Sequence, residues 1–181
     1  MEAPQYPVGS YDPKEDDQPS LRETLIGIIE KAPLALREAV AGLSNAQLDT
    51  RYKNWTIRQI VHHLADSHAN SYIRFKWALT EDQPVIKAYD ENKWSDLAES
   101  KEGPIEGPLA MMEGIHKQWV QLLYSMTEKQ FARAFIHPSN NRVIVLSNAL
   151  GTYAWHGRHH TGQILWMREH GPNGLGTGPW H

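Results

Sequence analysis

Apolar residues recur at helical spacing in four long segments of the chain. The first runs from about residue 21 to 43, and Pro33 within it predicts a kink or a local break. The others cover Thr56 to about 79, about 108–126, and Ser147 to near Gly171. Stripes of this kind bury one face of each helix against its neighbours, so the pattern predicts an all-α four-helix bundle.

Capping residues indicate where three of these helices begin. Ser20 is followed three positions later by Glu23, and Thr56 by Gln59. A hydroxyl residue three positions before Glu or Gln is the signature of a capping box, so we expect one at each of these two helix starts. Ser147 predicts the cap of the fourth helix.

The connections between the helices differ in length. Residues 80–107 contain four Gly or Pro residues and no sustained apolar period. A connection of this length is long enough to cross the bundle, so that the third helix runs parallel to the second. Residues 131–146 contain two short extended runs around Pro-Ser-Asn-Asn and predict at most a small hairpin.

The two ends of the chain lack helical periodicity. Residues 1–19 contain four Pro, so we expect an extended N-terminal segment, packed on the surface by Tyr6 and Tyr11. Residues 171–181 contain four Gly and two Pro, which predicts a tail. At about 150 residues per domain, the whole chain 1–181 is expected to form one domain.

A weak internal repeat relates the two halves of the chain. Leu43–Leu48 (LSNAQL) and Met126–Phe131 (MTEKQF) each follow a long helix. Each then precedes a short irregular stretch and a helix that carries histidines. The two halves are therefore expected to be copies of one helix pair, related by a pseudo-twofold axis.

Composition excludes several classes of function. The chain of 181 residues has 18 Lys and Arg against 21 Asp and Glu, a formal charge of −3 that argues against nucleic acid or an anionic membrane as a partner. No Cys is present, which excludes disulfides, Cys-ligated zinc and a thiol nucleophile of the protein itself. The N-terminus has no signal-peptide pattern and no apolar run is long enough to span a membrane, so we expect a cytoplasmic protein.

Ten histidines stand out, and three of them form a candidate metal site. His156 and His160 lie one helical turn apart, a spacing at which two imidazoles can bind one divalent ion. His63 has the equivalent position on its own helix, beside the apolar stripe. Three imidazoles leave positions open for water or substrate, as catalytic sites do, and a bound water would be acidified towards a pKa of about 7.

A simpler interpretation stands beside this one, because two histidines at this spacing also arise by chance in His-rich proteins. His68 lies nearer the centre of its apolar stripe, so it is a candidate for a buried histidine bonded to a carbonyl. His62 and His159 point elsewhere and are expected to face solvent or to lie behind the ligands. The remaining histidines show no partner pattern: His116, His137, His170 and His181.

Other polar and aromatic residues are weaker candidates. Asp66 could hydrogen-bond a ligand imidazole, although a solvated surface position is the simpler expectation. Asn70 and Gln163 could line the pocket or simply lie on polar helix surface. Among the tryptophans, Trp94 in the long connection could cover a substrate pocket, whereas three are expected in the core: Trp55, Trp119 and Trp155.

Several motifs together resemble a known family. These are Tyr6–Gly9, Trp55–His68, Asn70–Lys76, Phe131, His137-Pro138, Asn148–Gly151 and Trp155–His160. They are similar to the YfiT-type proteins, named metal-dependent hydrolases, of the DinB-like superfamily. The resemblance covers about residues 6–168 and leaves out the glycine-rich tail.

The resemblance implies a DinB-like metal-binding domain with an up-down-down-up bundle. It also implies homodimers, and that His63, His156 and His160 hold one Zn²⁺ or Ni²⁺ ion per chain together with water. Three functions follow as hypotheses. The first is a hydrolase that uses metal-bound water on a small-molecule substrate. The second is a thiol S-transferase that conjugates bacillithiol or a similar low-molecular-weight thiol to electrophiles, a chemistry found in the same superfamily. The third is a metal-binding bundle without turnover.

Overall fold

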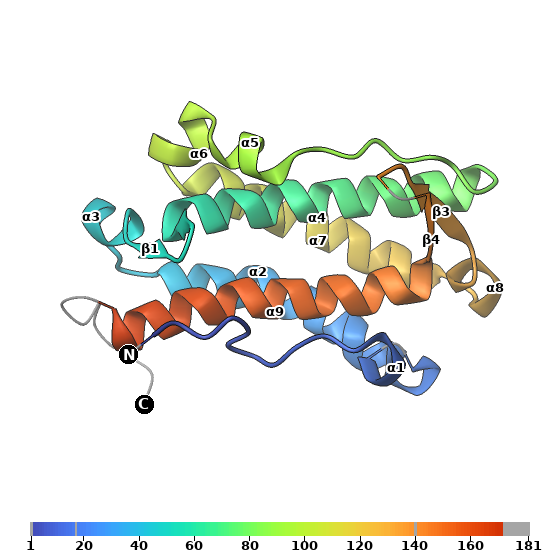
Figure 1. Cartoon of the computed structure of the whole chain (residues 1–181). Coiled ribbons are helices and arrows are strands. Elements are labelled where there is room, and N and C mark those ends of the chain that lie inside the picture. The colour runs from blue at the N-terminus through green and yellow to red at the C-terminus, as the bar shows by residue number, and fades with distance from the viewer. Residues whose placement is uncertain (1, 17, 140, 172–181) are drawn as a thin grey trace.

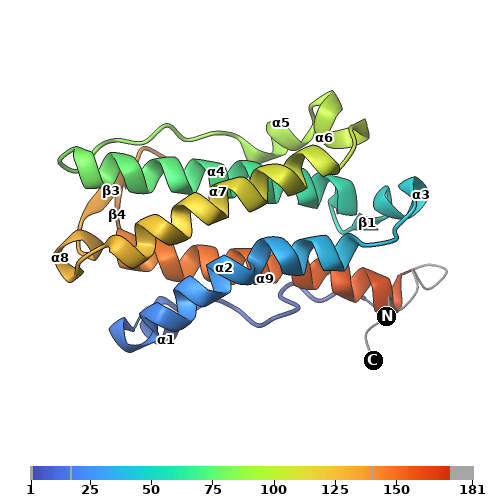
Figure 2. The same cartoon turned by 180° about the vertical axis from the view of Figure 1, so that it is seen from behind.

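The computed structural model describes residues 2–16, 18–139 and 141–171, and the predicted tail lies outside them except for Gly171. Its long helices are α2 (Arg22–Val40), α4 (Ile57–Thr80), α7 (Glu106–Ser125) and α9 (Leu146–His170). Helices α2 and α9 run in one direction, and α4 and α7 run in the other (Figures 1 and 2). The predicted four-helix bundle with parallel second and third helices is confirmed. Within the described residues, no helix is both long and apolar enough to cross a membrane.

The helix starts confirm one of the three predicted caps. Thr56 and Gln59 form both hydrogen bonds of a capping box at the start of α4. The box expected at Ser20 is wrong, because Pro19–Leu21 forms a short 3-10 helix, η1, and α2 begins after Leu21 without a side-chain cap. The cap expected at Ser147 is also wrong. Helix α9 follows a strand directly, and Val145 takes the capping position. Pro33 lies inside α2, which continues through it.

The internal repeat corresponds to matching local structure in both halves. LSNAQL forms the short helix α3 (Asn45–Leu48) and MTEKQF forms α8 (Glu128–Phe131), each opened by a capping box. Each is followed by an antiparallel strand pair that leads into a long helix. The first pair is β1 (Arg51–Tyr52) with β2 (Trp55–Thr56), and the second, in the region predicted as a hairpin, is β3 (Ala134–His137) with β4 (Arg142–Val145).

The long crossover contains two short helices, α5 (Glu91–Ser95) and α6 (Ala98–Glu102). Before them, the chain runs extended beside α4 (Figure 1). There it joins the hairpin, because Ile86 N–H donates to the Ile136 carbonyl at 3.0 Å and Ile136 N–H donates to the Pro84 carbonyl at 2.9 Å. The crossover and β3 therefore form a continuous extended layer beside α4.

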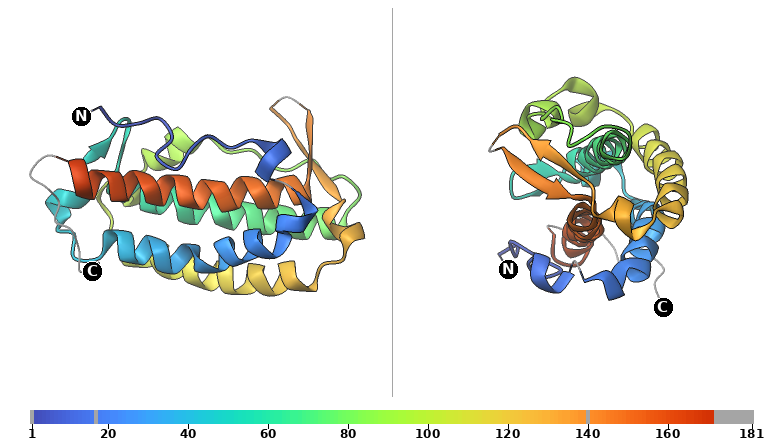
Figure 3. Two further views of the ribbon diagram at one scale, coloured as in Figure 1. Left: turned by 90° about the horizontal axis from the view of Figure 1, so that it is seen from below. Right: turned by 90° about the vertical axis from the view of Figure 1, so that its right-hand side faces the viewer.

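The N-terminal segment lies along α9, with a single helical turn, α1 (Pro13–Asp16) (Figure 3). Trp155 donates from its indole N–H to the Gly9 carbonyl at 2.9 Å. Gly162 permits this close approach, since a Cβ there would lie 2.8 Å from Val8 Cγ1. Tyr6 and Tyr11 both pack against Trp155, as the sequence predicts.

The core consists of two apolar clusters, one toward each end of the bundle. Between them, each long helix contributes polar or helix-breaking residues: Pro33 on α2, His68 on α4, His116 on α7, and His156 on α9. The ends of the bundle thus supply apolar burial, while its middle carries polar chemistry.

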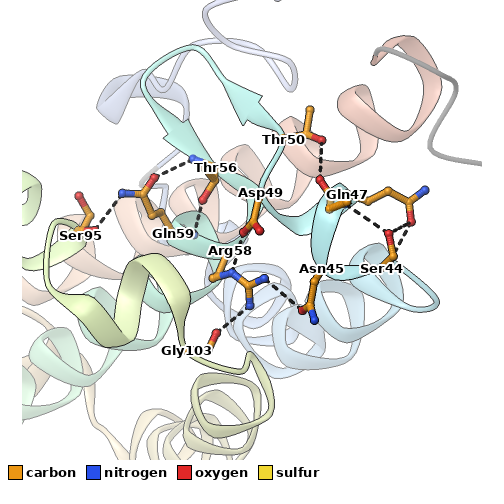
Figure 4. A network of polar contacts seen from close by, with 11 residues as sticks. Ser44, Asn45, Gln47, Asp49, Thr50, Thr56, Arg58, Gln59, Ser95 and Gly103 are labelled. Carbon is orange, nitrogen blue, oxygen red and sulfur yellow. Dashed lines mark hydrogen bonds and ion pairs between the residues drawn. The ribbon is translucent and has the colours of Figure 1, made fainter.

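A buried arginine fixes the start of α4 (Figure 4). Arg58 is 4% exposed and donates to Asp49 Oδ1 at 2.8 Å, to the Gly103 carbonyl at 2.7 Å and to Asn45 Oδ1 at 3.2 Å. Next to it, the Gln59 side chain donates to the Ser95 carbonyl at 2.9 Å. These bonds tie the crossover and α3 to the helix that carries His63.

Candidate metal centre

Three histidines from two antiparallel helices meet in the middle of the bundle. His63 comes from α4, and His156 and His160 come from successive turns of α9. Each offers one ring nitrogen, and these three atoms all lie within 4.8 Å of one another. The structure therefore brings together the three residues that the sequence singles out as ligands.

The protonation of this cluster suits a metal ion. Burial lowers the pKa of His63 to about 4 and that of His160 well below its ordinary value, and burial together with the neighbouring imidazoles does the same for His156. All three are therefore neutral at pH 7 and carry a free lone pair. Neutral imidazole is the form that ligates divalent metals.

The spacing within the cluster also fits an ion. His63 Nε2 and His156 Nε2 are 3.1 Å apart. Two nitrogen lone pairs at this distance repel each other unless a cation or proton lies between them. A tetrahedral ion with ligand distances of about 2.0–2.1 Å would separate two of its nitrogens by about 3.3 Å. The pair is thus already near ligand spacing.

Behind His156 lies a chain of buried imidazoles. His156 Nδ1 is 3.3 Å from His68 Nε2, and His68 Nδ1 is 2.9 Å from His116 Nε2. His116 Nδ1 in turn lies 2.6 Å from the carbonyl oxygen of Ile29 on α2. This imidazole chain, His156–His68–His116, links the cluster to the opposite side of the bundle.

The Ile29 carbonyl determines the tautomer of every ring in the imidazole chain. Because a carbonyl only accepts, His116 carries its proton on Nδ1 and accepts on Nε2. His68 must then donate from Nδ1 and accept on Nε2, and His156 must donate from Nδ1. The lone pair of His156 is thereby left on Nε2, which faces His63.

Pro33 explains why this carbonyl is available. In an α-helix the carbonyl of residue 29 would accept from the N–H of residue 33. Pro33 has no N–H, so the Ile29 oxygen inside α2 has no helical donor and accepts from His116 instead. On the other side His68 packs against Gly157, where its Cε1 would lie in van der Waals contact, at 3.4 Å, with an added Cβ.

The orientation of His160 is fixed by an amide. Gln163 Oε1 accepts from His160 Nδ1 at 2.8 Å, which leaves the Nε2 lone pair of His160 free. The Gln163 amide N–H donates to His159 Nε2 at 3.0 Å. Trp55 covers the cluster, with its ring 4.5 Å from that of His63 and 6.0 Å from that of His160. Of the weaker candidates, Gln163 is the one that contacts a ligand histidine.

Asp66 and Asn70 do not contact the cluster. Asn70 donates to the Asp66 backbone carbonyl at 2.9 Å, within its own helix. Burial, and to a lesser extent the charge of Glu99 in the crossover, raises the pKa of the Asp66 carboxyl to about 6. Among the described residues, neither side chain hydrogen-bonds to His63, His156 or His160.

The remaining histidines differ from expectation in two places. His116 is buried in the imidazole chain, so the expectation that it has no partner is wrong. His68 is buried as predicted, but it reaches a carbonyl only through His116. His159 lies behind the ligands, one of the two positions expected for it: it is 7% exposed, accepts from the Gln163 amide and stacks on Trp155 at 4.7 Å. His62 is half-buried, with no bond to the cluster among the residues described.

The burial of the tryptophans also differs in part from expectation. Trp119 is fully buried, as predicted. Trp55 and Trp155 are half-buried, because one covers the histidine cluster and the other lies beneath the N-terminal segment. Trp94 is 38% exposed and packs on Tyr89 at 4.4 Å.

A cavity of about 240 Å³ opens beside His156. It is bounded by α4, α9, β3 and the crossover, and its lining residues are Ser67, Arg74, Tyr89, Glu91, His137, Thr152, Tyr153 and His156. Sequence reasoning missed Arg74 and the tyrosines and treated His137 as incidental. No sequence pattern singles out Arg74, because its burial and its place in the cavity wall depend on how α4 packs against the rest of the fold.

A family profile and the sequences of known proteins point to the same family. The DinB superfamily profile matches residues 28–164. A Bacillus subtilis (strain 168) protein named "Putative metal-dependent hydrolase YfiT" is 47% identical over 161 residues, which are 88% of this chain and 90% of that protein. A Bacillus cereus (strain AH820) protein with a similar name is 46% identical over 166 residues, 91% of this chain and 95% of that one.

A solved structure agrees with these matches. It is described as YfiT from Bacillus subtilis, "a probable metal-dependent hydrolase with an unusual four-helix bundle topology". It superimposes with a TM-score of 0.85 at 45% identity and covers 90% of this chain and 94% of its own. With a matching family profile, near-half identity to relatives along most of its length and the same fold, the chain belongs to the DinB superfamily.

Proposed function

We propose that this chain is a metal-dependent enzyme that acts on a small molecule, with His63, His156 and His160 holding one divalent ion, Zn²⁺ or Ni²⁺. The observation that carries the proposal is the convergence of three neutral imidazoles, one of which, His156, lines a cavity. Structural zinc sites use four protein ligands, whereas catalytic sites use three and leave a position open. The three-histidine set therefore favours catalysis over a metal-binding bundle without turnover.

The first candidate reaction is hydrolysis. When bound, a divalent ion supplies Lewis acidity, which activates water or polarises a carbonyl. The chain's own residues orient the ligands through Ile29 and Gln163, and Tyr153 presents its hydroxyl to the cavity. The names of the Bacillus relatives support this candidate.

The second candidate is transfer of a low-molecular-weight thiol, such as bacillithiol, to an electrophile. One observation favours it. Among the described residues that line the cavity, the one carboxylate is Glu91, which is exposed, and Asp66 does not reach the cluster. Deprotonation of water requires a general base more than deprotonation of a thiol does, because a free thiol has a pKa of about 8.5. A soft thiolate also suits zinc. The chain has no Cys, so the sulfur would come from outside.

The metal site is tested by titrating the metal-stripped protein with Zn²⁺ or Ni²⁺ in a calorimeter. We expect one ion per chain, and a loss of at least 100-fold in affinity in His156→Ala. His62→Ala is the matched control, because His62 adjoins a ligand in sequence but lies outside the cluster. Unchanged affinity in His156→Ala would refute the site.

The reaction is tested by assaying the zinc-loaded protein on ester and amide panels beside bacillithiol with a chromogenic electrophile. Metal-dependent ester or amide cleavage that disappears in His156→Ala establishes the hydrolase. Metal-dependent conjugation without hydrolysis establishes the transferase. If neither reaction depends on the metal, the bundle without turnover remains.

The homodimer implied by the family resemblance stays a prediction. Light scattering after size exclusion would test it, with twice the 20.6 kDa chain mass as the expected result. The cytoplasmic location is likewise a prediction, which fractionation of the source cells would test.

A further inference from the structure

The cavity beside the histidine cluster contains a buried cation with an unused donor. Arg74 is 8% exposed, and one terminal guanidinium nitrogen donates to the Tyr153 hydroxyl at 3.3 Å. Its Nε is buried and has no hydrogen-bond partner among the residues that the structure describes. No carboxylate of the described residues lies within 4.0 Å of this guanidinium. Since a buried, unpaired charge is costly, its position in a cavity wall points to a ligand of opposite charge.

The other walls of the cavity supply hydrogen-bond donors without a second cation. Burial, more than any neighbour, raises the pKa of the Tyr89 hydroxyl to about 12, so this group stays protonated. Burial and the charges of Arg74 and Arg142 lower the pKa of His137, which keeps that ring neutral at pH 7. Glu91 is exposed at the rim. Arg74 is thus the one cationic side chain among the described lining residues.

We propose that Arg74 binds a carboxylate of the substrate, and that the cavity thereby selects small monoanionic molecules. The planar guanidinium matches a carboxylate in shape, and a single cation balances a single negative charge. The volume of about 240 Å³ lies below the roughly 300–1,000 Å³ of sites for drug-sized ligands. His156 lies in the same cavity wall, so a molecule held at Arg74 would extend toward the histidine cluster.

That last step rests on the proposed function, whereas carboxylate binding by Arg74 does not need a metal. The test therefore measures binding calorimetrically, with benzoate as the probe and neutral benzamide as its matched amide. Both are titrated into the full-length protein before and after loading with Zn²⁺. The variants are Arg74→Gln, Arg74→Lys and, as the matched control, Arg158→Gln, because Arg158 is an exposed arginine of α9 outside this cavity.

We expect benzoate to bind more tightly than benzamide, and this preference to fall at least tenfold in Arg74→Gln. Arg74→Lys keeps the charge and should retain part of the preference, which separates loss of the cation from loss of folding. Arg158→Gln should bind like the unmodified chain. Thermal unfolding of each variant identifies any that has lost its structure.

Unchanged benzoate affinity in folded Arg74→Gln overturns the inference. If instead the preference requires Zn²⁺ and disappears in His156→Ala but not in Arg74→Gln, the carboxylate binds the metal. Tighter binding of inorganic phosphate than of benzoate also overturns the carboxylate assignment. Benzoate binding at Arg74 in a protein that takes up no metal would leave this inference standing while the proposed function fails.

Discussion

The imidazole chain predicts that metal affinity depends on His116, a residue outside the histidine cluster. In His116→Phe the shape of the ring is kept, but the Nδ1 hydrogen of His68 loses its acceptor. His68 is fully buried, so this N–H finds no water. A buried unsatisfied donor costs about 1–3 kcal/mol, and the Ile29 carbonyl no longer sets the proton order, so the other tautomer of His68, with its proton on Nε2, becomes accessible.

That tautomer removes the lone pair which His156 needs for a metal. With its proton on Nε2, His68 donates to His156 Nδ1, and His156 must then hold its own proton on the nitrogen that faces His63. Partners behind metal ligands are typically worth 10–100-fold in affinity, or about 1.4–2.7 kcal/mol. We therefore expect His116→Phe to weaken Zn²⁺ binding by one to two orders of magnitude.

Calorimetric titration of Zn²⁺ measures this effect, beside two comparison variants. His116→Gln offers an amide N–H for the Ile29 carbonyl and an amide oxygen for His68, so it should recover most of the affinity. His62→Phe replaces a histidine outside the chain and should bind like the unmodified protein. Equal Zn²⁺ affinity in His116→Phe and the unmodified protein would show that the carbonyl does not set the tautomer of His156.

Three further predictions concern stability. Burial lowers the pKa of His116 from 6.5 to about 4. Between these pH values His116 is therefore protonated in the unfolded chain and neutral in the folded chain. Urea titrations should therefore show that the free energy of unfolding decreases as the pH drops from 6.5 to 4. In His116→Phe this decrease should be smaller by about 3 kcal/mol. Arg58→Leu should lower the free energy of unfolding, measured by thermal denaturation, by about 1–3 kcal/mol. Arg58→Lys should restore little of this stability, because the three acceptors around Arg58 require a planar guanidinium. Gly162→Ala should make the N-terminal segment more susceptible to proteolysis, whereas Gly27→Ala, with open space around it, should not.

The sequence predicts the bundle because its signals are local and periodic. Apolar stripes define the long helices, and Thr56 with Gln59 defines one start correctly. The caps predicted at Ser20 and Ser147 are wrong because a cap is predicted only from the residues next to it in sequence. In the structure, the 3-10 helix η1 and the strand β4 decide where these two long helices begin.

The candidate ligands were also within reach of sequence, since equivalent positions in two repeated helices can face each other across one groove if the halves are related by a twofold axis. The partners of His156 were not. His116 lies 87 residues from Ile29 in sequence, and neither periodicity nor composition brings an imidazole on α7 to a carbonyl on α2. Arg74 was not predicted for a related reason: a buried cation without a counter-ion can be recognised only when its surroundings in the fold are known.

Pro33 connects the fold to the chemistry most directly. Read along the sequence, it is a defect in the first long helix, and it predicts a kink. In the structure α2 continues past it, and the missing N–H leaves one carbonyl at the centre of the bundle without a helical donor. His116 supplies that donor, and the proton order it imposes passes through His68 to the nitrogen with which His156 faces the cluster. A helix-breaking residue in the middle of the bundle thus determines which nitrogen of a distant histidine keeps its lone pair.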